Sequence, residues 1–403
     1  MSASPPFLPY GKQVIDDDDI AAVAETLRSD FLTTGPVVEA FEQRLREITG
    51  AEHALAVANG TAALHLAAMA LDLGPGDLAV VPTMTFLATA NAARYVGADV
   101  VFADVDPRTG LLMPETLAAA LERGGERVRA VFPVHINGQT ADMPSLRQVP
   151  GARDLAFVED SCHAFGGLQA TSAGTPAPVG CCRDSTMSIF SFHPVKIAAM
   201  GEGGAITTND PEIHARIARL RNIGMERNPD ALEIADQAFG PDGEANPWYY
   251  EMPELGFNYR ASAIHCALGL SQLAKLDRFV AARAHLMAEY RARLASLSPL
   301  VEPVPVRSNV QVGWHLCVVH VDFAAAGTDR ATVMNKLRDA GIGTQVHYLP
   351  VHRQPYYRRC YGEISLPGAD AYYDSILSLP LHAAMTDGDV ERVVTALGEV
   401  LGC

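Results

Sequence analysis

The sequence predicts an α/β fold, with a mostly parallel sheet in a large domain and a smaller α+β domain at the C-terminus. Two observations support this class. Between about residues 54 and 221, short apolar segments alternate with segments whose apolar residues recur at helical spacing. The apolar segments are nearly continuous, which is typical of strands that helices cover on both faces. A chain of 403 residues is long enough for two or three domains.

Two helices are expected before the first strand. Four aspartates at residues 16–19 open the first helix, because negative charge is favourable at a helix N-terminus, and this explains them better than a metal site. The apolar face of this helix would comprise Ile20, Val23, Ala24 and Leu27. A turn at residues 31–36 leads to a second helix, which Gly50 ends.

The alternating part of the chain follows. We expect strands at residues 54–58, 78–82, 100–105, 128–134, 155–158 and 205–208, and helices at 62–71, 86–95, 114–122 and 211–221. In such sheets, ligands bind in the loops after the carboxyl ends of the strands. Residues 226–250 form a long irregular segment rich in Pro, Gly, Asp and Asn. A loop of this length is often functional or reaches a partner subunit.

The last third of the chain is expected to form the smaller domain. A helical stretch at residues 262–297 contains the boundary, which we place near residue 270, so that the two domains are 1–270 and 271–403. The smaller domain would contain strands at 314–321 and 343–347 and helices at 328–340, 369–376 and 388–400.

The composition argues against several classes of function. The net charge of −16 disfavours nucleic acids and anionic membranes as partners. No uncharged apolar run reaches transmembrane length, and the N-terminus lacks the basic and apolar segments of a signal peptide. The seven cysteines are scattered without a C-x-x-C pair, which predicts a reduced, cytoplasmic protein without disulfides or structural zinc.

Lys196 is the first candidate catalytic residue. It is one of only four lysines, and it alone has apolar neighbours on both sides, in a segment that ends in a glycine-rich run. Burial disfavours the ammonium form, and a neutral amine is a nucleophile toward carbonyls. The simpler explanation is a lysine that extends to solvent or pairs with Glu202.

Two further segments could carry chemistry. Gly60 and Thr61 follow a strand and open a helix, which suits anion binding, although simple helix capping has the same pattern. Asp160 follows the strand at 155–158, with His163 three residues later, and this acid could cap a helix or face a cationic ring nitrogen. The fingerprints of dinucleotide-binding folds, phosphate-loop NTPases, zincins and α/β-hydrolases are absent.

Seven short segments follow one another along nearly the whole chain. They are Leu32-Thr33-Thr34-Gly35-Pro36, Asn59-Gly60-Thr61-Ala62-Ala63-Leu64-His65, Val81-Pro82-Thr83-Met84-Thr85-Phe86, Glu159-Asp160, Phe190-Ser191-Phe192-His193-Pro194-Val195-Lys196, Glu202-Gly203-Gly204 and Gly256-Phe257-Asn258-Tyr259-Arg260. In this order they resemble the DegT/DnrJ/StrS family of sugar-nucleotide aminotransferases. These are pyridoxal-phosphate (PLP) enzymes with the type I, or aspartate aminotransferase, fold.

The resemblance implies a role for each matching residue. Lys196 would bind the cofactor covalently and move a proton, and Asp160 would keep the pyridine nitrogen of the cofactor protonated. The other cofactor-binding residues would be Gly60, Thr61, Phe86, His163, Ser191 and, from the neighbouring subunit, Asn258. The residues that contact the sugar nucleotide would be Tyr10, Leu32, Thr33, Thr34, His347 and Tyr348. The shared site implies a homodimer, and no metal is implied.

Additional segments are similar to one branch of the family. They are Pro9-Tyr10-Gly11-Lys12-Gln13, Ser29-Asp30-Phe31-Leu32-Thr33, Trp248-Tyr249-Tyr250-Glu251, Val346-His347-Tyr348-Leu349-Pro350-Val351-His352, Gln354-Pro355-Tyr356-Tyr357 and Ser378-Leu379-Pro380-Leu381. This branch uses glutamate to aminate C4 of UDP-2-acetamido-2,6-dideoxy-β-L-arabino-hex-4-ulose, which gives UDP-4-amino-4,6-dideoxy-N-acetyl-β-L-altrosamine for pseudaminic acid biosynthesis. The alternatives are an aminotransferase for another keto nucleotide sugar, such as the D-xylo epimer, and a non-catalytic relative that binds the cofactor or a sugar nucleotide.

The chain departs from the family pattern at a few positions. Ala58 stands where serine is usual, Ala199-Met200 where a Thr-Thr pair is usual, and Ala263 near where an acid is usual. Relatives that replace the lysine with histidine are dehydratases, so retention of Lys196 favours transamination.

Overall fold

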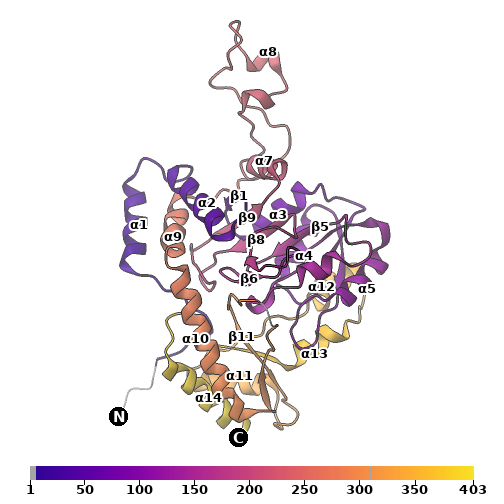
Figure 1. Ribbon diagram of the computed structural model, residues 1–403, viewed down its shortest axis with the longest axis vertical. Helices are drawn as coiled ribbons and strands as arrows, with labels where there is room; N and C mark the ends of the chain where they lie inside the picture. The colour runs from indigo at the N-terminus through magenta and orange to yellow at the C-terminus, as the bar shows by residue number, and fades with distance from the viewer. Residues whose placement is uncertain (1–5, 308–309) are drawn as a thin grey trace.

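The computed structural model describes residues 6–307 and 310–403. Its large sheet has seven strands in the order β1-β9-β8-β5-β4-β2-β3. Their bounds are His53–Val57 (β1), Leu78–Pro82 (β2), Asp99–Ala103 (β3), Val128–Val131 (β4), Ala156–Asp160 (β5), Met187–Ser191 (β8) and Gly204–Thr208 (β9). Only β9 runs against its neighbours β1 and β8, and the other strand pairs are parallel. The predicted α/β fold with a mostly parallel sheet is confirmed (Figure 1).

Helices cover both faces of this sheet. Along β2, Ala79 and Val81 pack into one core, whereas Leu78 and Val80 pack into another. This alternation shows why the strand sequence is continuously apolar: neither side chain direction leads to water. The helices around the sheet are α2 (Pro36–Thr49), α3 (Gly60–Ala70), α4 (Leu87–Tyr95), α5 (Pro114–Gly124), α6 (Met143–Arg147), α7 (Pro211–Leu220) and α9 (Ala263–Leu273). A small hairpin joins β6 (Leu168–Gln169) to β7 (Ala177–Pro178).

Helix α1 (Asp17–Arg28) turns a polar side toward the protein. Asp19 is fully buried, while Ile20 and Leu27 of the expected apolar face are exposed. The reason is a polar contact with the end of α9, because Asp19 accepts hydrogen bonds from Ser271 and Gln272. The apolar side of α1 is therefore left on the surface.

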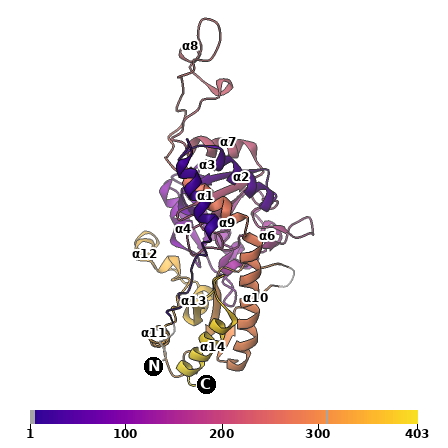
Figure 2. The ribbon, with the colours of Figure 1, turned by 90° about the vertical axis from the view of Figure 1, so that its left-hand side faces the viewer.

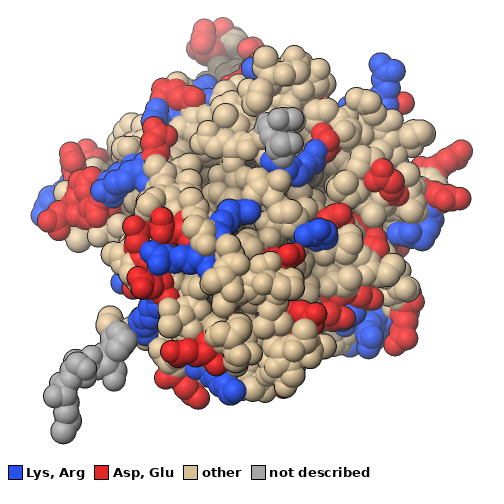
Figure 3. All heavy atoms as spheres, turned by 60° about the horizontal axis from the view of Figure 1, so that its bottom comes forward, with Lys and Arg blue, Asp and Glu red and all other residues tan. Residues whose placement is uncertain are grey.

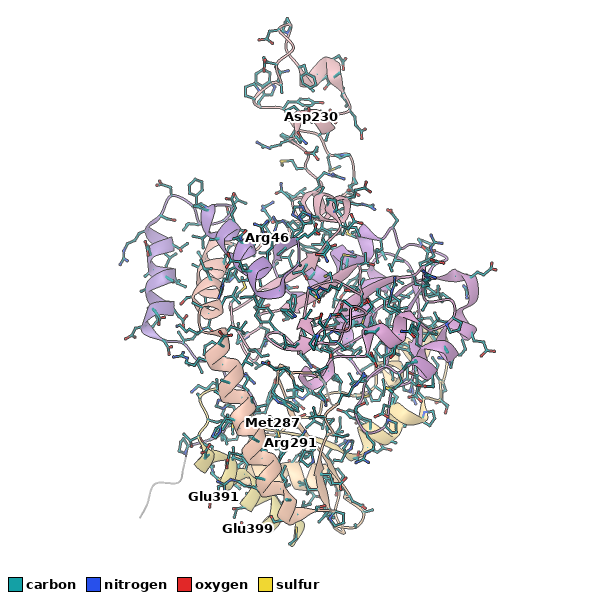
Figure 4. All side chains as sticks on the ribbon, viewed as in Figure 1. Arg46, Asp230, Met287, Arg291, Glu391 and Glu399 are labelled. Atoms are coloured by element: carbon teal, nitrogen blue, oxygen red, sulfur yellow. The ribbon has the colours of Figure 1, made fainter. Side chains whose placement is uncertain are left out.

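The C-terminal part contains a second core beneath the large sheet (Figures 1 and 2). Strands β10 (Val301–Pro303), β11 (Cys317–Val321) and β12 (Ile376–Leu379) form an antiparallel sheet. The helices of this part are α10 (Leu276–Leu294), α11 (Arg330–Asp339), α12 (Pro355–Tyr361), α13 (Pro367–Ser375) and α14 (Asp387–Leu401). Figure 4 shows Met287 on α10 and Glu391 and Glu399 on α14; Met287 is buried in this core, and both glutamates are exposed. The boundary near residue 270 stays a prediction.

Two expected elements differ from the structure in more than their bounds. The helical stretch at 262–297 is broken between α9 and α10, where Lys275 turns toward Asp18 and Asp19. The expected strand at 343–347 was wrong: Gln345 makes only one isolated bridge, to Ser378. The chain instead leaves the sheet after Gln345, and His347 and Tyr348 line a cavity.

The segment between α7 and α9 forms an arm that projects from the body in both ribbon views and contains α8 (Ala235–Ala238) (Figures 1 and 2). Figure 4 places Asp230 in this arm, with side chains around it that point into open space. Several large apolar side chains of the arm and its base are exposed: Ile234, Trp248, Tyr250, Met252 and Leu255.

The surface at the end of the molecule that carries the termini is of mixed charge. Figure 3 shows acidic and basic side chains interspersed over this face, without a large patch of either sign. Among the helices within residues 6–307 and 310–403, none combines the length and the apolar character needed to cross a membrane.

Candidate active site

A cavity of about 440 Å³ lies where β5 and β8 end and α3 begins. This volume falls within the range of roughly 300–1,000 Å³ that is usual for small-molecule sites. The predicted site residues that line it are Tyr10, Gly60, Thr61, Phe86, Asp160, His163, Ser191, Lys196, His347 and Tyr348. The fold thus brings together segments from the N-terminus, the large sheet and the C-terminal part.

The N-terminus of α3 gives this cavity a corner that suits an anion. The first N–H groups of a helix have no intrahelical acceptor. The Asn59 side chain accepts the N–H of Ala62 at 2.8 Å, which leaves those of Gly60 and Thr61 for a ligand. Gly60 packs so closely on β8 that a Cβ there would lie 3.0 Å from the Cβ of Ser191, so the serine hydroxyl stands beside these groups. A phosphate fits such donors.

The Asp160 carboxylate is buried and held on both oxygens. It is 6% exposed, and its Oδ2 accepts a hydrogen bond from the Thr89 hydroxyl at 2.7 Å. Its Oδ1 accepts the backbone N–H of Cys162 at 3.2 Å. The Thr85 hydroxyl lies 2.7 Å from that of Thr89 and completes the chain of hydroxyls. A carboxylate fixed in this way is a well-placed acceptor for a cationic ring nitrogen.

Lys196 lies in the turn that follows β8, where its backbone N–H donates to the His193 carbonyl at 2.8 Å. Burial lowers the pKa of the Lys196 ammonium, although the charges of Cys162 and Asp160 oppose this effect. Glu202 also lines the cavity, but the described residues contain no ion pair between Glu202 and Lys196. The arrangement therefore favours an amine that reacts over one that is neutralised by an acid.

Three of the four histidines that line the cavity are His163, His315 and His347. Burial holds the pKa values of His163 and His315 well below their usual range and lowers that of His347 to about 3. All three are therefore neutral hydrogen-bonding groups at physiological pH. His347 Nδ1 lies 2.8 Å from the Ser378 hydroxyl, and His163 Nε2 lies 2.9 Å from the hydroxyl of Tyr348.

Phe86 is the N-cap residue of α4 and is 55% exposed. Its ring lies 6.0 Å from that of Tyr348 and forms an apolar side of the cavity. A flat aromatic ring that binds here would find one face of the site already formed.

Some residues of the cavity were missed by sequence reasoning. They are Asn59, Leu64, Thr85, Ala88, Val134, Cys162, His193, Val195, Glu202 and His315. The spacing of Thr85 and Thr89, one helical turn apart and next to Phe86, could have indicated a shared polar face. No sequence signal marks His315, which lies in an irregular segment before β11 and whose ring centroid is 4.5 Å from that of His163.

Four predicted site residues do not line this cavity. Leu32, Thr33 and Thr34 belong to the turn between α1 and α2. Thr34 instead lines a second cavity of about 170 Å³, together with Val38, Ala56, Ala218, Arg221, Asn222, Arg260 and Ala261. Asn258 forms a backbone bridge with Asn222 and so lies beside this second cavity.

The donor set of the main cavity fits PLP. An anion corner at α3, a fixed carboxylate at Asp160, an aromatic wall at Phe86 and a buried amine at Lys196 face one space. These are the groups that a phosphate, a pyridinium nitrogen, an aromatic ring and an aldehyde respectively require.

The chain is similar to known aminotransferases along nearly its whole length. The model of the DegT/DnrJ/EryC1/StrS aminotransferase family matches residues 13–398. The spore coat polysaccharide biosynthesis protein SpsC of Bacillus subtilis (strain 168) is 37% identical over 398 residues, which cover 98% of this chain and 97% of that protein.

Two solved structures illustrate the structural likeness. Spr1654 from Streptococcus pneumoniae, described as a sugar aminotransferase and solved in its PLP form, has a TM-score of 0.86 and 25% identity, covering 98% of this chain and 99% of its own. Helicobacter pylori PseC, an aminotransferase involved in the biosynthesis of pseudoaminic acid, has a TM-score of 0.85 and 26% identity with the same coverage.

Proposed function

Because the chain belongs to the DegT/DnrJ/EryC1/StrS aminotransferase family and is a PLP-dependent sugar aminotransferase, we propose that it uses glutamate to aminate C4 of UDP-2-acetamido-2,6-dideoxy-β-L-arabino-hex-4-ulose. The product would be UDP-4-amino-4,6-dideoxy-N-acetyl-β-L-altrosamine. The observation that supports a keto sugar as the substrate is the wall of neutral donors and acceptors around Lys196, formed by Tyr10, His347 and Tyr348. Hydroxyl and imidazole groups suit the hydroxyl and carbonyl groups of a sugar.

The residues of the main cavity would share the work of this reaction. When bound, PLP supplies an electron sink that stabilises negative charge on the carbon next to the transferred nitrogen. Asp160 holds a proton on the ring nitrogen, and Gly60, Thr61 and Ser191 anchor the phosphate. Lys196 would hold the cofactor covalently, and its amine would carry a proton to and from the substrate carbon.

We further propose that the enzyme is a homodimer whose active sites are formed by residues of both subunits. Among the described residues, the main cavity is lined by no arginine, and Lys196 is its only lysine. A nucleotide diphosphate needs more positive charge than this. Arg260, with Thr34 and Asn222, stands at the second cavity next to Asn258. We assign this group, together with Leu32 and Thr33, to the active site of a second copy of the chain.

Exposed apolar side chains support such a dimer. Phe31 and Leu32, which belong to the same turn as Thr34, are 53% and 45% exposed, and Trp248 in the arm is 72% exposed. Such side chains are common at subunit interfaces and costly in water. We also propose that this enzyme is cytoplasmic, because its seven cysteines are all free, as is usual in a reducing compartment.

The main alternative is another keto nucleotide sugar, such as the D-xylo epimer. The observation that favours it is the higher identity to the spore coat polysaccharide protein, 37%, than to PseC, 26%. Both substrates present a C4 carbonyl and differ in the configuration of the ring, so the cavity geometry alone is compatible with each.

An absorbance experiment on the purified protein tests the proposal. Glutamate should bleach the visible band of the bound cofactor in the first half-reaction. After removal of glutamate, the L-arabino and the D-xylo 4-keto UDP-sugars are added separately. Recovery of the band with the L-arabino compound alone supports the proposed substrate. Recovery with the D-xylo compound alone moves the enzyme to another pathway, and recovery with neither contradicts both assignments.

A further inference from the structure

His163 makes hydrogen bonds at both ring nitrogens. The backbone N–H of Asn137 lies 3.3 Å from Nδ1, and the hydroxyl of Tyr348 lies 2.9 Å from Nε2. A backbone N–H can only donate, so Nδ1 must accept. Burial, with Lys196 and His347 nearby, holds the pKa of His163 well below its usual range. A neutral imidazole has one hydrogen, which therefore lies on Nε2 and is donated to the oxygen of Tyr348.

The N–H of Asn137 is held rigidly in this direction. Asn137 has a φ of 63°, in the left-handed region that asparagine adopts more readily than most residues. Its carbonyl accepts the backbone N–H groups of His315 and Leu316 at 3.2 and 3.3 Å. Its side-chain amide donates to the Tyr372 hydroxyl at 2.8 Å. Three contacts from the C-terminal part thus fix the group that selects the tautomer of His163.

This tautomer determines what the Tyr348 hydroxyl can do. The oxygen already accepts a hydrogen from His163, so its own hydrogen must point elsewhere. Burial raises the pKa of Tyr348 well above its usual range, and the hydroxyl keeps its proton. Within residues 6–307 and 310–403, His163 is the one hydrogen-bonding partner of this hydroxyl, and Tyr348 lines the cavity.

We infer that the Tyr348 hydroxyl donates a hydrogen bond to an oxygen atom of a molecule bound in the cavity, and that the Nε2–H tautomer of His163 aims it there. The acceptor has the chemistry of a carbonyl or a phenolate oxygen. Two sources offer such an atom: the ring oxygen of PLP, and the carbonyl of the keto sugar. The second source rests on the proposed function, whereas the first requires only the cofactor.

Three variants test this inference. Tyr348→Phe removes the hydroxyl but keeps the ring, whose centroid lies 4.9 Å from that of His347. His163→Gln replaces the imidazole with an amide, which also offers a donor and an acceptor. This variant should therefore partly preserve the direction of the Tyr348 hydroxyl. Tyr356→Phe removes a hydroxyl on α12, outside the cavity, and serves as the control. Thermal melting of each holoenzyme establishes that it is folded.

The first measurement is the tautomer itself. Nitrogen-15 NMR of protein labelled at histidine should show one neutral histidine with its hydrogen on Nε2 whose signals shift in Tyr348→Phe. A signal assigned to His163 with the hydrogen on Nδ1 would overturn the inference. This measurement needs neither turnover nor a substrate.

The second measurement separates the two acceptors. If the acceptor is the ring oxygen of PLP, Tyr348→Phe shifts the visible absorbance band of the substrate-free holoenzyme. If it is the sugar carbonyl, the band and the glutamate half-reaction are unchanged, while the rate constant of the half-reaction with the keto sugar falls roughly 10- to 100-fold. Tyr356→Phe should change neither quantity.

A Tyr348→Phe enzyme that matches the parent in the band and in both half-reactions overturns the inference. If the parent enzyme reacts with no keto sugar, the proposed function fails by itself. The visible absorbance band of the Tyr348→Phe holoenzyme then decides the inference. A shifted band supports the hydroxyl as a donor to the cofactor, and an unchanged band overturns the inference.

Discussion

The hydroxyl of Thr89 donates a hydrogen bond to Oδ2 of Asp160 at 2.7 Å, within the buried floor of the candidate active site. Thr89 lies on α4, one turn after Phe86, and Asp160 ends β5. A residue that does not line the cavity thus fixes the carboxylate on which the proposed cofactor chemistry depends.

We expect Thr89→Val to weaken cofactor binding. The variant keeps the shape of the side chain but removes one of the hydrogen bonds to a buried carboxylate, a bond worth about 1.5–3 kcal/mol. The dissociation constant of PLP, measured by fluorescence titration of the apoprotein, should rise roughly tenfold or more. Thr89→Ser retains the hydroxyl and is the matched control. Equal affinities of the two variants would show that this hydrogen bond does not position Asp160.

Lys196→Ala should be folded and without turnover. The amine is the proposed attachment point of the cofactor and the proposed proton carrier, so both half-reactions should be lost by more than about 1,000-fold. Circular dichroism establishes the fold, and the absorbance assay with glutamate measures the loss. Normal turnover by this variant would remove Lys196 from the mechanism.

Lys196→Met should stabilise the apoprotein at neutral pH. A lysine whose pKa is lowered by burial binds fewer protons in the folded than in the unfolded protein between the two pKa values. The free energy of unfolding therefore rises with pH through that window, and the penalty is complete below it. Removing the amine removes the penalty, so the melting temperature of the apoprotein at pH 7 should rise.

Lys275→Met is the control of opposite sign. Burial also acts on Lys275, but hydrogen bonds with Asp19 and Asp18, each 2.9 Å from Nζ, raise its pKa. Asp19 is fully buried, and removal of one partner of a buried ion pair typically costs about 3–5 kcal/mol. The melting temperature should fall in Lys275→Met. A fall in both lysine variants would contradict the distinction between a reactive and a structural lysine.

The hydrogen-bonded pair of His135 and Glu159 should help to hold Asp160 in its position. Both side chains are fully buried, and His135 Nε2 lies 2.7 Å from Oε2 of Glu159. The backbone N–H of Ala141 donates to Nδ1 of His135 at 3.1 Å, so Nε2 carries the hydrogen.

Glu159→Leu would leave this N–H without an acceptor at a cost of about 1–3 kcal/mol. It should also loosen Asp160, whose backbone carbonyl accepts the N–H of His135 at 3.0 Å. We expect a lower melting temperature together with weaker PLP binding. Glu159→Gln keeps an acceptor and should lose less of both. A loss of stability with unchanged cofactor affinity would limit the pair to a structural role.

Mixed dimers test the shared active sites. Lys196→Ala and an Asn258→Ala variant are unfolded together and refolded, or coexpressed. If Asn258 acts on the neighbouring subunit, each mixed dimer has one complete site, and random pairing restores about a quarter of the parent activity. If Asn258 acts within its own chain, both sites of every mixed dimer are defective and no activity returns. Size-exclusion chromatography measures the dimer itself.

The sequence by itself determined much of the large sheet. Strand β2 has the expected bounds, and β1, β5 and β9 lie within one or two residues of them, because continuous apolar runs and glycine turns are local signals. The ends of β3 and β4 were set too late by two and three residues, because the apolar pattern continues past the last ladder hydrogen bonds. The family match confirms the fold class and the PLP-dependent aminotransferase chemistry that the ordered motifs indicated.

Other features depended on the tertiary structure. The polar contact of Asp19 with α9 leaves the apolar side of α1 on the surface. The spacing of apolar residues within α1 cannot predict a contact with a residue so far along the chain. The segment at 343–347 alternates like a strand, yet it leaves the sheet after Gln345 to place His347 beside Lys196. Long-range contacts override local preference in both places.

The same distinction between local and long-range contacts explains which active-site residues could be predicted from the sequence. Lys196, Asp160 and Gly60 stand next to strand ends, and the carboxyl ends of parallel strands meet at one edge, so sequence order alone could bring them together. His315 and the chain from Asn137 through His163 to Tyr348 join residues up to 211 positions apart. Leu32, Thr34 and Asn258 do not line the main cavity of their own chain. Only packing in three dimensions decides which hydroxyl faces a ligand, because hydrogen-bond direction depends on neighbours that the local sequence does not contain.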